Sequence, residues 1–206
     1  MYNRPVDLSF AFDFLNSRLS RLGKQAYCVG GSVRDFLLGL PFDDFDFALP
    51  LYPEEVLRCF PEADARFRRY GSFQVAIGGR RIDLTCFRRE GDYLDHRHPG
   101  KLEFGVDMAE DSKRRDFTIN ALYLDASGNV YDFHQGLSDL ASGLIRFIGD
   151  PRKRIEEDPL RIERAYRFKD KLGFSFDAKT GEEIEALRGL LANINPDKLR
   201  MEGKKR

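Results

Sequence analysis

The spacing of apolar and polar residues along the chain predicts a mixture of helices and strands. Residues 6–23 repeat apolar positions at helical spacing and end at Gly23, a residue type that commonly follows a helix. The apolar run at 26–29 predicts a short buried strand, residues 31–39 predict a helix that a glycine opens and another closes, and residues 45–49 predict a second strand. The expected order is therefore helix, strand, helix, strand.

The middle of the chain continues this mixture. Residues 53–60 predict a short helix, and residues 72–87 alternate apolar and polar positions around Gly78-Gly79, which is a two-residue signal for a β-hairpin. Residues 118–133 predict another pair of strands. Residues 88–114 are polar, and because long structureless segments inside compact domains usually serve a function, we predict a moving functional loop there.

From Ser138 onward the pattern is almost entirely helical, and a turn at Gly149-Asp150-Pro151 separates it from the part before. We therefore predict an α+β protein of two domains. A head at residues 1–148 holds a small mixed sheet flanked by helices, and a helical domain follows at residues 149–206.

Composition narrows the function classes. The 206 residues carry 34 basic and 34 acidic side chains, so a polyanion must be bound by local patches and not by overall charge. Cys28, Cys59 and Cys86 are scattered and in no C-x-x-C spacing, which argues against a disulfide scaffold and against a zinc site. No targeting segment and no membrane-length apolar run are present. We predict a cytoplasmic protein without a membrane partner.

Asp44 and Asp46 are the first candidate site. In a strand their side chains share one face, about 7 Å apart, with Phe45 and Phe47 on the other face. Like charges so placed repel, but a hard cation between them makes the arrangement favourable, and Mg²⁺ is typically held by one or two carboxylates plus substrate phosphates. The alternative is a D-x-D sequence that merely ends a strand at the surface.

Gly30, Gly31 and Ser32 form the second candidate site. Two glycines let the backbone approach a ligand closely, the helix that follows offers free N–H groups, and the Ser32 hydroxyl adds a donor. A plain strand-to-helix turn is the alternative. Beside a carboxylate pair on the next strand, a phosphate cradle favours nucleotide chemistry.

Four motifs carry a family resemblance over roughly residues 27–170. They resemble, in the family's order, those of class II tRNA nucleotidyltransferases (CCA-adding enzymes) and bacterial poly(A) polymerases, which share a polymerase-β-like head. They are GGSVRDFLLG with DDFDFAL (residues 30–49), the ribose-recognising RRDFTINAL (114–122), the head-to-neck connector DFHQGLSDLASGLIRFIGDP (132–151) and the neck motif EEDPLRIERAYRF (156–168).

The resemblance implies an enzyme, a template-independent RNA 3′-end nucleotidyltransferase. It would add C, A or both from CTP and ATP to tRNA by two-metal phosphoryl transfer, with Mg²⁺ held by Asp44 and Asp46. Poly(A) synthesis, transfer to a small molecule, and a catalytically silent RNA-binding fragment stay open. The neck motif argues against a small-molecule substrate, and the intact aspartates argue against a silent fragment.

The resemblance also implies how a nucleotide is bound. Arg114, Arg115 and Asn120 supply donors for phosphate and ribose oxygens, and Asp116 orients its neighbours; a solvated turn before a strand is the alternative. The implied nucleotide-binding residues are Gly30, Gly31, Ser32, Arg34, Arg115, Asp116, Asn120, Asp158, Arg161, Arg164 and Arg167.

The neck motif implies that Asp158 and Arg161 act as a template for the incoming base. Three positions apart, they would share a helix face, where the aspartate accepts from a base amino group and the arginine donates. An ordinary ion pair on the helix surface is the alternative. Arg164 and Arg167 could also form a solvated basic stripe or follow an RNA backbone.

Three features show how closely the chain follows the family pattern: two departures from it and one segment that matches a flexible loop. Asp83 stands where relatives usually have glutamate, and two roles stay open for it, a third catalytic carboxylate or a structural residue of the hairpin. Asp95 and Arg97 match the family's flexible loop, which helps these enzymes accept ATP. The chain ends at residue 206 within what resembles the last neck motif, so we expect a fragment, or a protein without the RNA-holding part.

Overall fold

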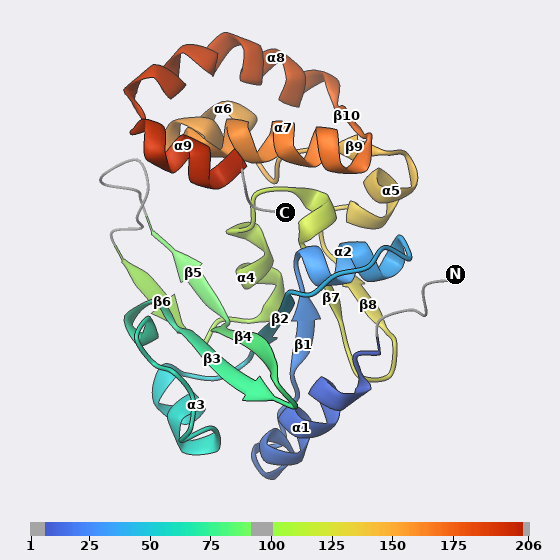
Figure 1. Ribbon diagram of the computed structural model, residues 1–206, viewed down its shortest axis with the longest axis vertical. Helices are drawn as coiled ribbons and strands as arrows, with labels where there is room; N and C mark the ends of the chain where they lie inside the picture. The colour runs from blue at the N-terminus through green and yellow to red at the C-terminus, as the bar shows by residue number, and fades with distance from the viewer. Residues whose placement is uncertain (1–6, 92–100, 204–206) are drawn as a thin grey trace.

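The computed structural model describes residues 7–91 and 101–203, and it combines a mixed sheet with a layer of helices (Figure 1). The six strands of the main sheet lie in the order β3-β4-β2-β1-β7-β8. Their bounds are β1 (Tyr27–Val29), β2 (Phe45–Leu49), β3 (Ser72–Ile77), β4 (Arg80–Cys86), β7 (Leu122–Leu124) and β8 (Val130–Asp132). Strand β2 runs parallel to β4 and the other neighbours are antiparallel, which confirms the predicted small mixed sheet.

Short helices flank this sheet as predicted. Helix α1 ends at Leu19, and a 3₁₀ turn η1 (Ser20–Leu22) carries the chain to Gly23, whose φ of 65° is the left-handed conformation that glycine adopts without strain. The helices of this part are α1 (Ser9–Leu19), α2 (Gly31–Leu37), α3 (Pro53–Cys59) and α4 (Met108–Lys113), with 3₁₀ turns η2 (Arg68–Tyr70) and η3 (Thr118–Asn120).

The two faces of the sheet differ because residues alternate along β2 and its neighbours. Phe45 and Phe47 of β2 are buried, and the ring of Phe47 packs edge-on against Phe12 of α1 at 5.1 Å between ring centres. Asp46 between them points to the opposite face. Because of this alternation, one face of the sheet packs toward α1 and the core, and the opposite face carries polar side chains of β2 and β4.

A helical layer covers the opposite end of the molecule, at the top of Figure 1. Helix α6 begins after Asp150, whose carboxylate accepts a hydrogen bond from the Lys153 N–H, with Pro151 in the first turn. The helices are α5 (Gly136–Ala141), α6 (Pro151–Glu157), α7 (Leu160–Leu172), α8 (Ala178–Leu187) and α9 (Pro196–Gly203), with the 3₁₀ turn η4 (Arg188–Asn193) and a parallel strand pair of β9 (Leu144–Ile145) and β10 (Ser175–Phe176).

The sheet and the helical layer share one hydrophobic core. Phe117, just before η3, stacks on Phe147 and meets Phe168 of α7 edge-on, with ring centres 4.7 and 5.6 Å apart. Ile162 of α7 is fully buried in the same cluster as the core of the sheet. The division into a head and a helical domain near residue 149 stays a prediction.

The prediction of a structureless loop over residues 88–114 is wrong for the described part. Strand β5 (Arg88–Glu90) pairs with β6 (Leu102–Phe104), and helix α4 follows. Both strands are only three residues long, and an ion pair between Arg89 and Glu103 at 2.6 Å joins them. Because these residues are charged, a search for alternating apolar residues does not find the strands. Asp95 and Arg97 lie outside the described residues.

Candidate active site

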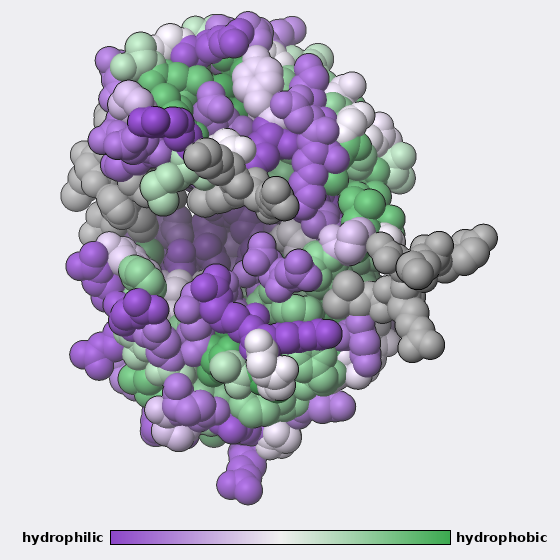
Figure 2. Space-filling model, in the orientation of Figure 1, coloured by the Kyte–Doolittle hydropathy of each residue, from purple (hydrophilic) through white to green (hydrophobic). Residues whose placement is uncertain are grey.

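A polar cavity of about 820 Å³ lies between the sheet and the helical layer. Figure 2 shows it as a hollow lined by hydrophilic residues. The structure brings almost all of the predicted site residues to its wall. These are Gly30, Gly31, Ser32, Arg34, Asp44, Asp46, Arg115, Asp116, Asn120, Asp158, Arg161, Arg164 and Arg167.

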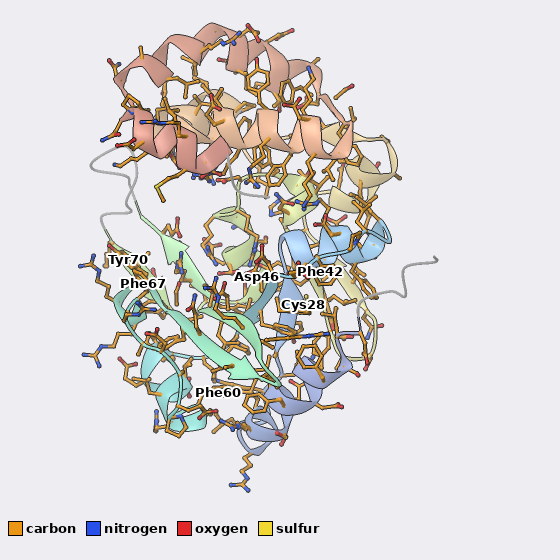
Figure 3. The ribbon with its side chains drawn as sticks, viewed as in Figure 1. Cys28, Phe42, Asp46, Phe60, Phe67 and Tyr70 are labelled. Atoms are coloured by element: carbon orange, nitrogen blue, oxygen red, sulfur yellow. The ribbon has the colours of Figure 1, made fainter. Side chains whose placement is uncertain are left out.

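Strand β2 carries the acidic centre of this cavity (Figure 3). Asp44 is exposed just before the strand, Asp46 is half-buried within it, and Asp83 of β4 is the direct cross-strand neighbour of Asp46. Burial raises the pKa of the Asp46 carboxyl to about 6, the charges of Asp83 and Asp44 add to this, and Arg115 and Arg81 oppose it. The site therefore gathers negative charge around the partly buried carboxyl group of Asp46, where burial makes that charge unfavourable.

Ser32 holds the two aspartates in place. Its hydroxyl donates to the Asp44 carbonyl at 2.7 Å and accepts from the Asp46 N–H at 3.1 Å, and the side chain is buried. The hydroxyl proton is therefore engaged by the backbone, and the role of Ser32 as a donor to a phosphate stays a prediction. It links the start of α2 to the start of β2.

Asp83 lies close enough to Asp46 to act with it. One oxygen, Oδ1, is buried and accepts no hydrogen bond, and its nearest cation is the Arg81 Nε at 3.7 Å. Asp83 does not line the large cavity. Together with Asp46 it borders a second, smaller cavity of about 270 Å³. The parallel pairing of β2 with β4 places Asp83, whose side chain is shorter than that of a glutamate, beside Asp46. Its catalytic role stays a prediction.

The acidic centre fits a hard divalent cation. It offers an oxygen without a hydrogen bond on Asp83, a carboxylate on Asp46 whose pKa is raised by burial and by the neighbouring carboxylates, and an exposed carboxylate on Asp44. Within residues 7–91 and 101–203, no three Asp, Glu, His or Cys side chains form a complete ligand set. A divalent cation at this centre would therefore take further ligands from water or from a bound substrate.

Gly30 brings the backbone close to this centre. Its φ of 70° and ψ of −140° suit glycine, and a Cβ placed there would lie 3.7 Å from Oδ2 of Asp46 and 3.8 Å from a guanidinium nitrogen of Arg115. Helix α2 begins at the next residue. The beginning of α2, the carboxylate and the guanidinium therefore face one small space.

Arg34 is buried, and its guanidinium is largely committed to protein partners. It donates to Oδ1 of Asn120 at 2.6 Å and to Asp35 at 2.8 Å, and it lies over the ring of Phe168 at 4.9 Å. Asp35 in turn pairs with Lys171 of α7 at 3.2 Å. Arg34 and Asn120 therefore meet at the cavity wall as a bonded pair that joins α2 to η3, and Asp35 with Lys171 joins α2 to α7.

Arg115 is fixed by residues that the sequence did not indicate. It donates to the Tyr123 hydroxyl at 3.0 Å and pairs with the buried Asp111 at 3.4 Å, and Tyr123 itself donates to Asp111 at 2.6 Å. Burial alone would raise the pKa of Asp111, but Arg114 and Arg115 lower it to about 2. The buried carboxylate thus holds both arginines of the RRDFTINAL motif.

Asp116 gathers the arginines of the helical layer. It accepts from Arg161 Nε at 2.6 Å and from Arg164, and it lies 3.7 Å from Arg154. Although burial alone would raise the pKa of the Asp116 carboxyl, these guanidinium groups hold it well below its usual range. The hydrogen bonds support the expectation that Asp116 orients its neighbours.

Asp158 and Arg161 do not share a helix face, which corrects the prediction for this pair. Asp158 ends α6 in an extended conformation with φ −152° and ψ 96°, because the following Pro159 disfavours helical geometry at the residue before it. Its carboxylate accepts from the Leu160 N–H and from Arg164, and Arg161 binds Asp116 and Glu157. The pair still lines the same cavity wall.

Arg164 and Arg167 are not a solvated stripe. Their side chains are 24% and 16% exposed, and both pair with the buried Glu202 of α9, at 3.6 and 3.2 Å. Sequence reasoning also missed other cavity residues, because their side chains meet only through the tertiary fold. These are Asp35, Phe42, Asp43, Tyr70, Arg88, Glu90, Phe168 and Lys171.

No helix in the described parts of the chain is long and apolar enough to cross a membrane. The thiols of Cys28, Cys59 and Cys86 are free.

The comparisons with known proteins agree with this architecture. Residues 26–146 match the family model described as the poly A polymerase head domain. A CCA-adding enzyme from Ligilactobacillus salivarius is 40% identical over 200 residues, which is 97% of this chain and 49% of that protein. The chain thus spans about half the length of the curated relatives it matches.

Solved structures give the same result. The Bacillus stearothermophilus CCA-adding enzyme in complex with CTP superposes with a TM-score of 0.84 at 35% identity, covering 95% of this chain and 47% of that one. The Thermotoga maritima CCA-adding enzyme complexed with tRNA gives 0.77 at 26% identity, covering 97% and 47%.

The fold and the matching family model define a nucleotidyltransferase head domain of the polymerase-β-like class. The chain belongs to the family that contains the tRNA nucleotidyltransferases and bacterial poly(A) polymerases, as its four sequence motifs predicted.

Proposed function

We propose that this chain carries the catalytic head and the nucleotide-recognising neck of a template-independent tRNA nucleotidyltransferase. It adds C and A residues from CTP and ATP to tRNA 3′ ends. The observation that carries the proposal is the pair of carboxylates of Asp44 and Asp46 at a cavity whose other walls carry arginines, with Asp83 beside Asp46 on the parallel strand β4. The names of the similar proteins, CCA-adding enzymes solved with CTP and with tRNA, support this substrate class.

Charges of both signs line the cavity. Asp44 and Asp46 lie at the sheet with Arg115 beside them, and the arginines held by Asp116 lie toward the helical layer. Phosphate groups of a nucleotide suit the space near Gly30 and Arg115, because backbone and guanidinium donors face it. The base suits the wall where α6 meets α7.

Asp44 and Asp46 would hold Mg²⁺, with Asp83 as the third carboxylate. When bound, the cation would neutralise the clustered carboxylates and polarise the reacting oxygens of the phosphoryl transfer. Ser32 sets the spacing of Asp44 and Asp46 through the two hydrogen bonds of its hydroxyl.

Asp158 and Arg161 would recognise the base only after their present partners are exchanged. Asp158 now accepts from Arg164, and Arg161 now donates to Asp116. We propose that the incoming C or A takes over part of these hydrogen bonds, the amino group donating to Asp158.

The free thiols of Cys28, Cys59 and Cys86 support a reducing, cytoplasmic setting.

The test is nucleotide incorporation with single substrates. Transcripts of tRNA lacking the last three nucleotides, or ending in CC, are incubated with the chain, Mg²⁺ and one labelled nucleotide at a time. We expect CMP on the first transcript and AMP on the second, with no UMP or GMP on either. Long A tails on any RNA would indicate a poly(A) polymerase instead, and incorporation of all four nucleotides would contradict base recognition by the neck.

A further inference from the structure

Tyr123 does not line the large cavity, but its hydroxyl group contacts Arg115, which does. The residue lies on β7 and is fully buried. Burying a hydroxyl group costs free energy unless the group is hydrogen-bonded, so its partners show what this side chain contributes.

A small apolar cluster, separate from the main core, fixes the ring of Tyr123. Its buried members are Val29, Ala48, Phe87 and Tyr123. Phe87 meets the Tyr123 ring edge-on with ring centres 6.0 Å apart, and Tyr27 of β1 stacks on Phe87 at 5.9 Å. Because a ring packed on its faces and edges cannot move, the hydroxyl oxygen at its end has a fixed position.

The hydroxyl group of Tyr123 joins a carboxylate to an arginine. It donates to Oδ2 of Asp111 at 2.6 Å and accepts from Nε of Arg115 at 3.0 Å. Burial raises the pKa of this hydroxyl, so it keeps the proton that it donates. The other oxygen of Asp111, Oδ1, accepts from Nε of Arg114 at 2.8 Å and from the Arg88 N–H at 2.9 Å. Oδ2 is therefore shared by Tyr123 and Arg115.

Arg115 is held at two nitrogens of its guanidinium group. Nε donates to Tyr123 at 3.0 Å, and Nη2 donates to Asp111 at 3.4 Å, which is a long contact. The Tyr123 hydroxyl is therefore the closer acceptor. Because a guanidinium group is planar, fixing Nε and Nη2 also fixes the direction of Nη1. Within residues 7–91 and 101–203, Nη1 itself donates no hydrogen bond.

Nη1 of Arg115 borders the space between Gly30 and Asp46. A Cβ atom placed on Gly30 would lie 3.8 Å from Nη1 and 3.7 Å from Oδ2 of Asp46. In the proposed function this space takes phosphate groups of the nucleotide. A donor that is already fixed there loses less conformational entropy on binding a phosphate than a freely rotating arginine would.

We propose that Tyr123 is a positioning residue of the nucleotide site. Its hydroxyl holds Arg115 in the orientation that directs Nη1 at a phosphate of the incoming nucleotide. Without the hydroxyl, Asp111 would hold Arg115 only through the contact at 3.4 Å, and the guanidinium group would be free to turn. The inference rests on the proposed function and adds to it a residue outside the cavity lining.

Nuclear magnetic resonance of the arginine side chains tests the hold on Arg115 without any nucleotide. In a chain labelled with ¹⁵N we expect a slowly exchanging Nε–H signal of Arg115, identified by its loss in Arg115→Lys. Tyr123→Phe removes only the hydroxyl group. It should make this proton exchange at least about tenfold faster, which is the typical worth of one hydrogen bond to a charged group.

Tyr131→Phe is the matched control for this variant. Tyr131 of β8 is the cross-strand partner of Tyr123, and its hydroxyl also donates to a carboxylate, that of Asp125 at 3.1 Å. It does not line the large cavity. Its removal should leave the exchange of the Arg115 Nε–H unchanged. Unchanged exchange in Tyr123→Phe, or an equal acceleration in Tyr131→Phe, overturns the proposal.

Binding of CTP with Mg²⁺, measured by calorimetry without RNA, tests whether the held arginine serves the nucleotide. Tyr123→Phe should raise Kd for CTP about threefold to tenfold, because binding must then immobilise one more long side chain. Arg115→Ala removes the donor itself and should raise Kd further. The double variant should bind no more weakly than Arg115→Ala, since Tyr123 acts only through Arg115, whereas a merely structural role gives additive losses.

The outcomes of the binding experiment separate the two proposals. An unchanged Kd in folded Tyr123→Phe, or additive losses in the double variant, overturns the positioning role while the proposed function stands. Tyr131→Phe should leave Kd unchanged, and a rise equal to that of Tyr123→Phe also overturns the role. If the wild type itself binds no CTP, the proposed function fails and the assignment of Tyr123 fails with it.

Discussion

Replacing Asp46 by asparagine should stabilise the folded chain at neutral pH. The carboxyl is half-buried on β2, and burial together with Asp83 raises its pKa from 3.8 to about 6. Asparagine keeps the shape of the side chain and removes the charge. The substitution that should abolish metal-assisted chemistry should therefore increase the free energy of unfolding.

The size and pH window of this effect follow from the raised pKa. A rise of about two units corresponds to about 3 kcal/mol, and because the side chain keeps some solvent contact we expect about 1–3 kcal/mol. Between pH 4 and pH 6 the folded wild type retains a proton that the unfolded chain has released. Its stability therefore falls as pH rises through this window, whereas that of Asp46→Asn does not fall for this reason. The advantage of the variant should be small at pH 4 and complete above pH 7.

Urea unfolding at pH 4.5 and pH 7.5, in the presence of a chelator, measures this difference. Asp13→Asn is the matched control, because Asp13 is exposed on α1, and it should change stability by less than about 0.5 kcal/mol. A less stable Asp46→Asn variant at pH 7.5 would refute the reasoning. So would an equal gain at both pH values, because the gain would then not come from ionisation.

Three further outcomes are expected. Ser32→Ala removes the hydroxyl between Asp44 and Asp46, and it should cost about 1–3 kcal/mol of stability in urea unfolding and lower kcat more than it raises KM for CTP. Asp158→Ala should weaken discrimination for C and A over U and G by about 1–3 kcal/mol in single-nucleotide kinetics, with Glu163→Ala nearly unchanged. Binding of tRNA to residues 1–206 should be weak and fall steeply between 50 and 200 mM salt in filter binding, and tight, salt-insensitive binding would contradict it.

Local patterns predicted the sheet well because its central strand follows them. Phe45, Asp46 and Phe47 alternate, so sequence alone indicated the strand and the face that carries the carboxylate. The approach of Gly30 to Asp46 was likewise predictable, because two glycines precede a helix next to that strand. The parallel pairing that sets Asp83 beside Asp46 is a property of the whole sheet, which left the role of Asp83 open at the sequence level.

The failures have two different physical origins. Arg114, Arg115 and Tyr123 contact Asp111 within twelve residues of it, but its burial depends on the whole fold, so the spacing does not distinguish it from a surface ion pair. The extended conformation of Asp158 has a local cause, because Pro159 follows it, and the sequence itself contains that signal.

Single-turnover incorporation of labelled CMP into tRNA lacking its 3′ end tests the central claim most directly. Wild type and Asp46→Asn are compared at saturating CTP and Mg²⁺, after urea unfolding has shown that the variant is folded. The account predicts a loss on the order of a thousandfold or more, because Asp46 would hold the cation at the reacting phosphate. A folded Asp46→Asn variant that incorporates CMP within a few-fold of the wild-type rate would contradict it.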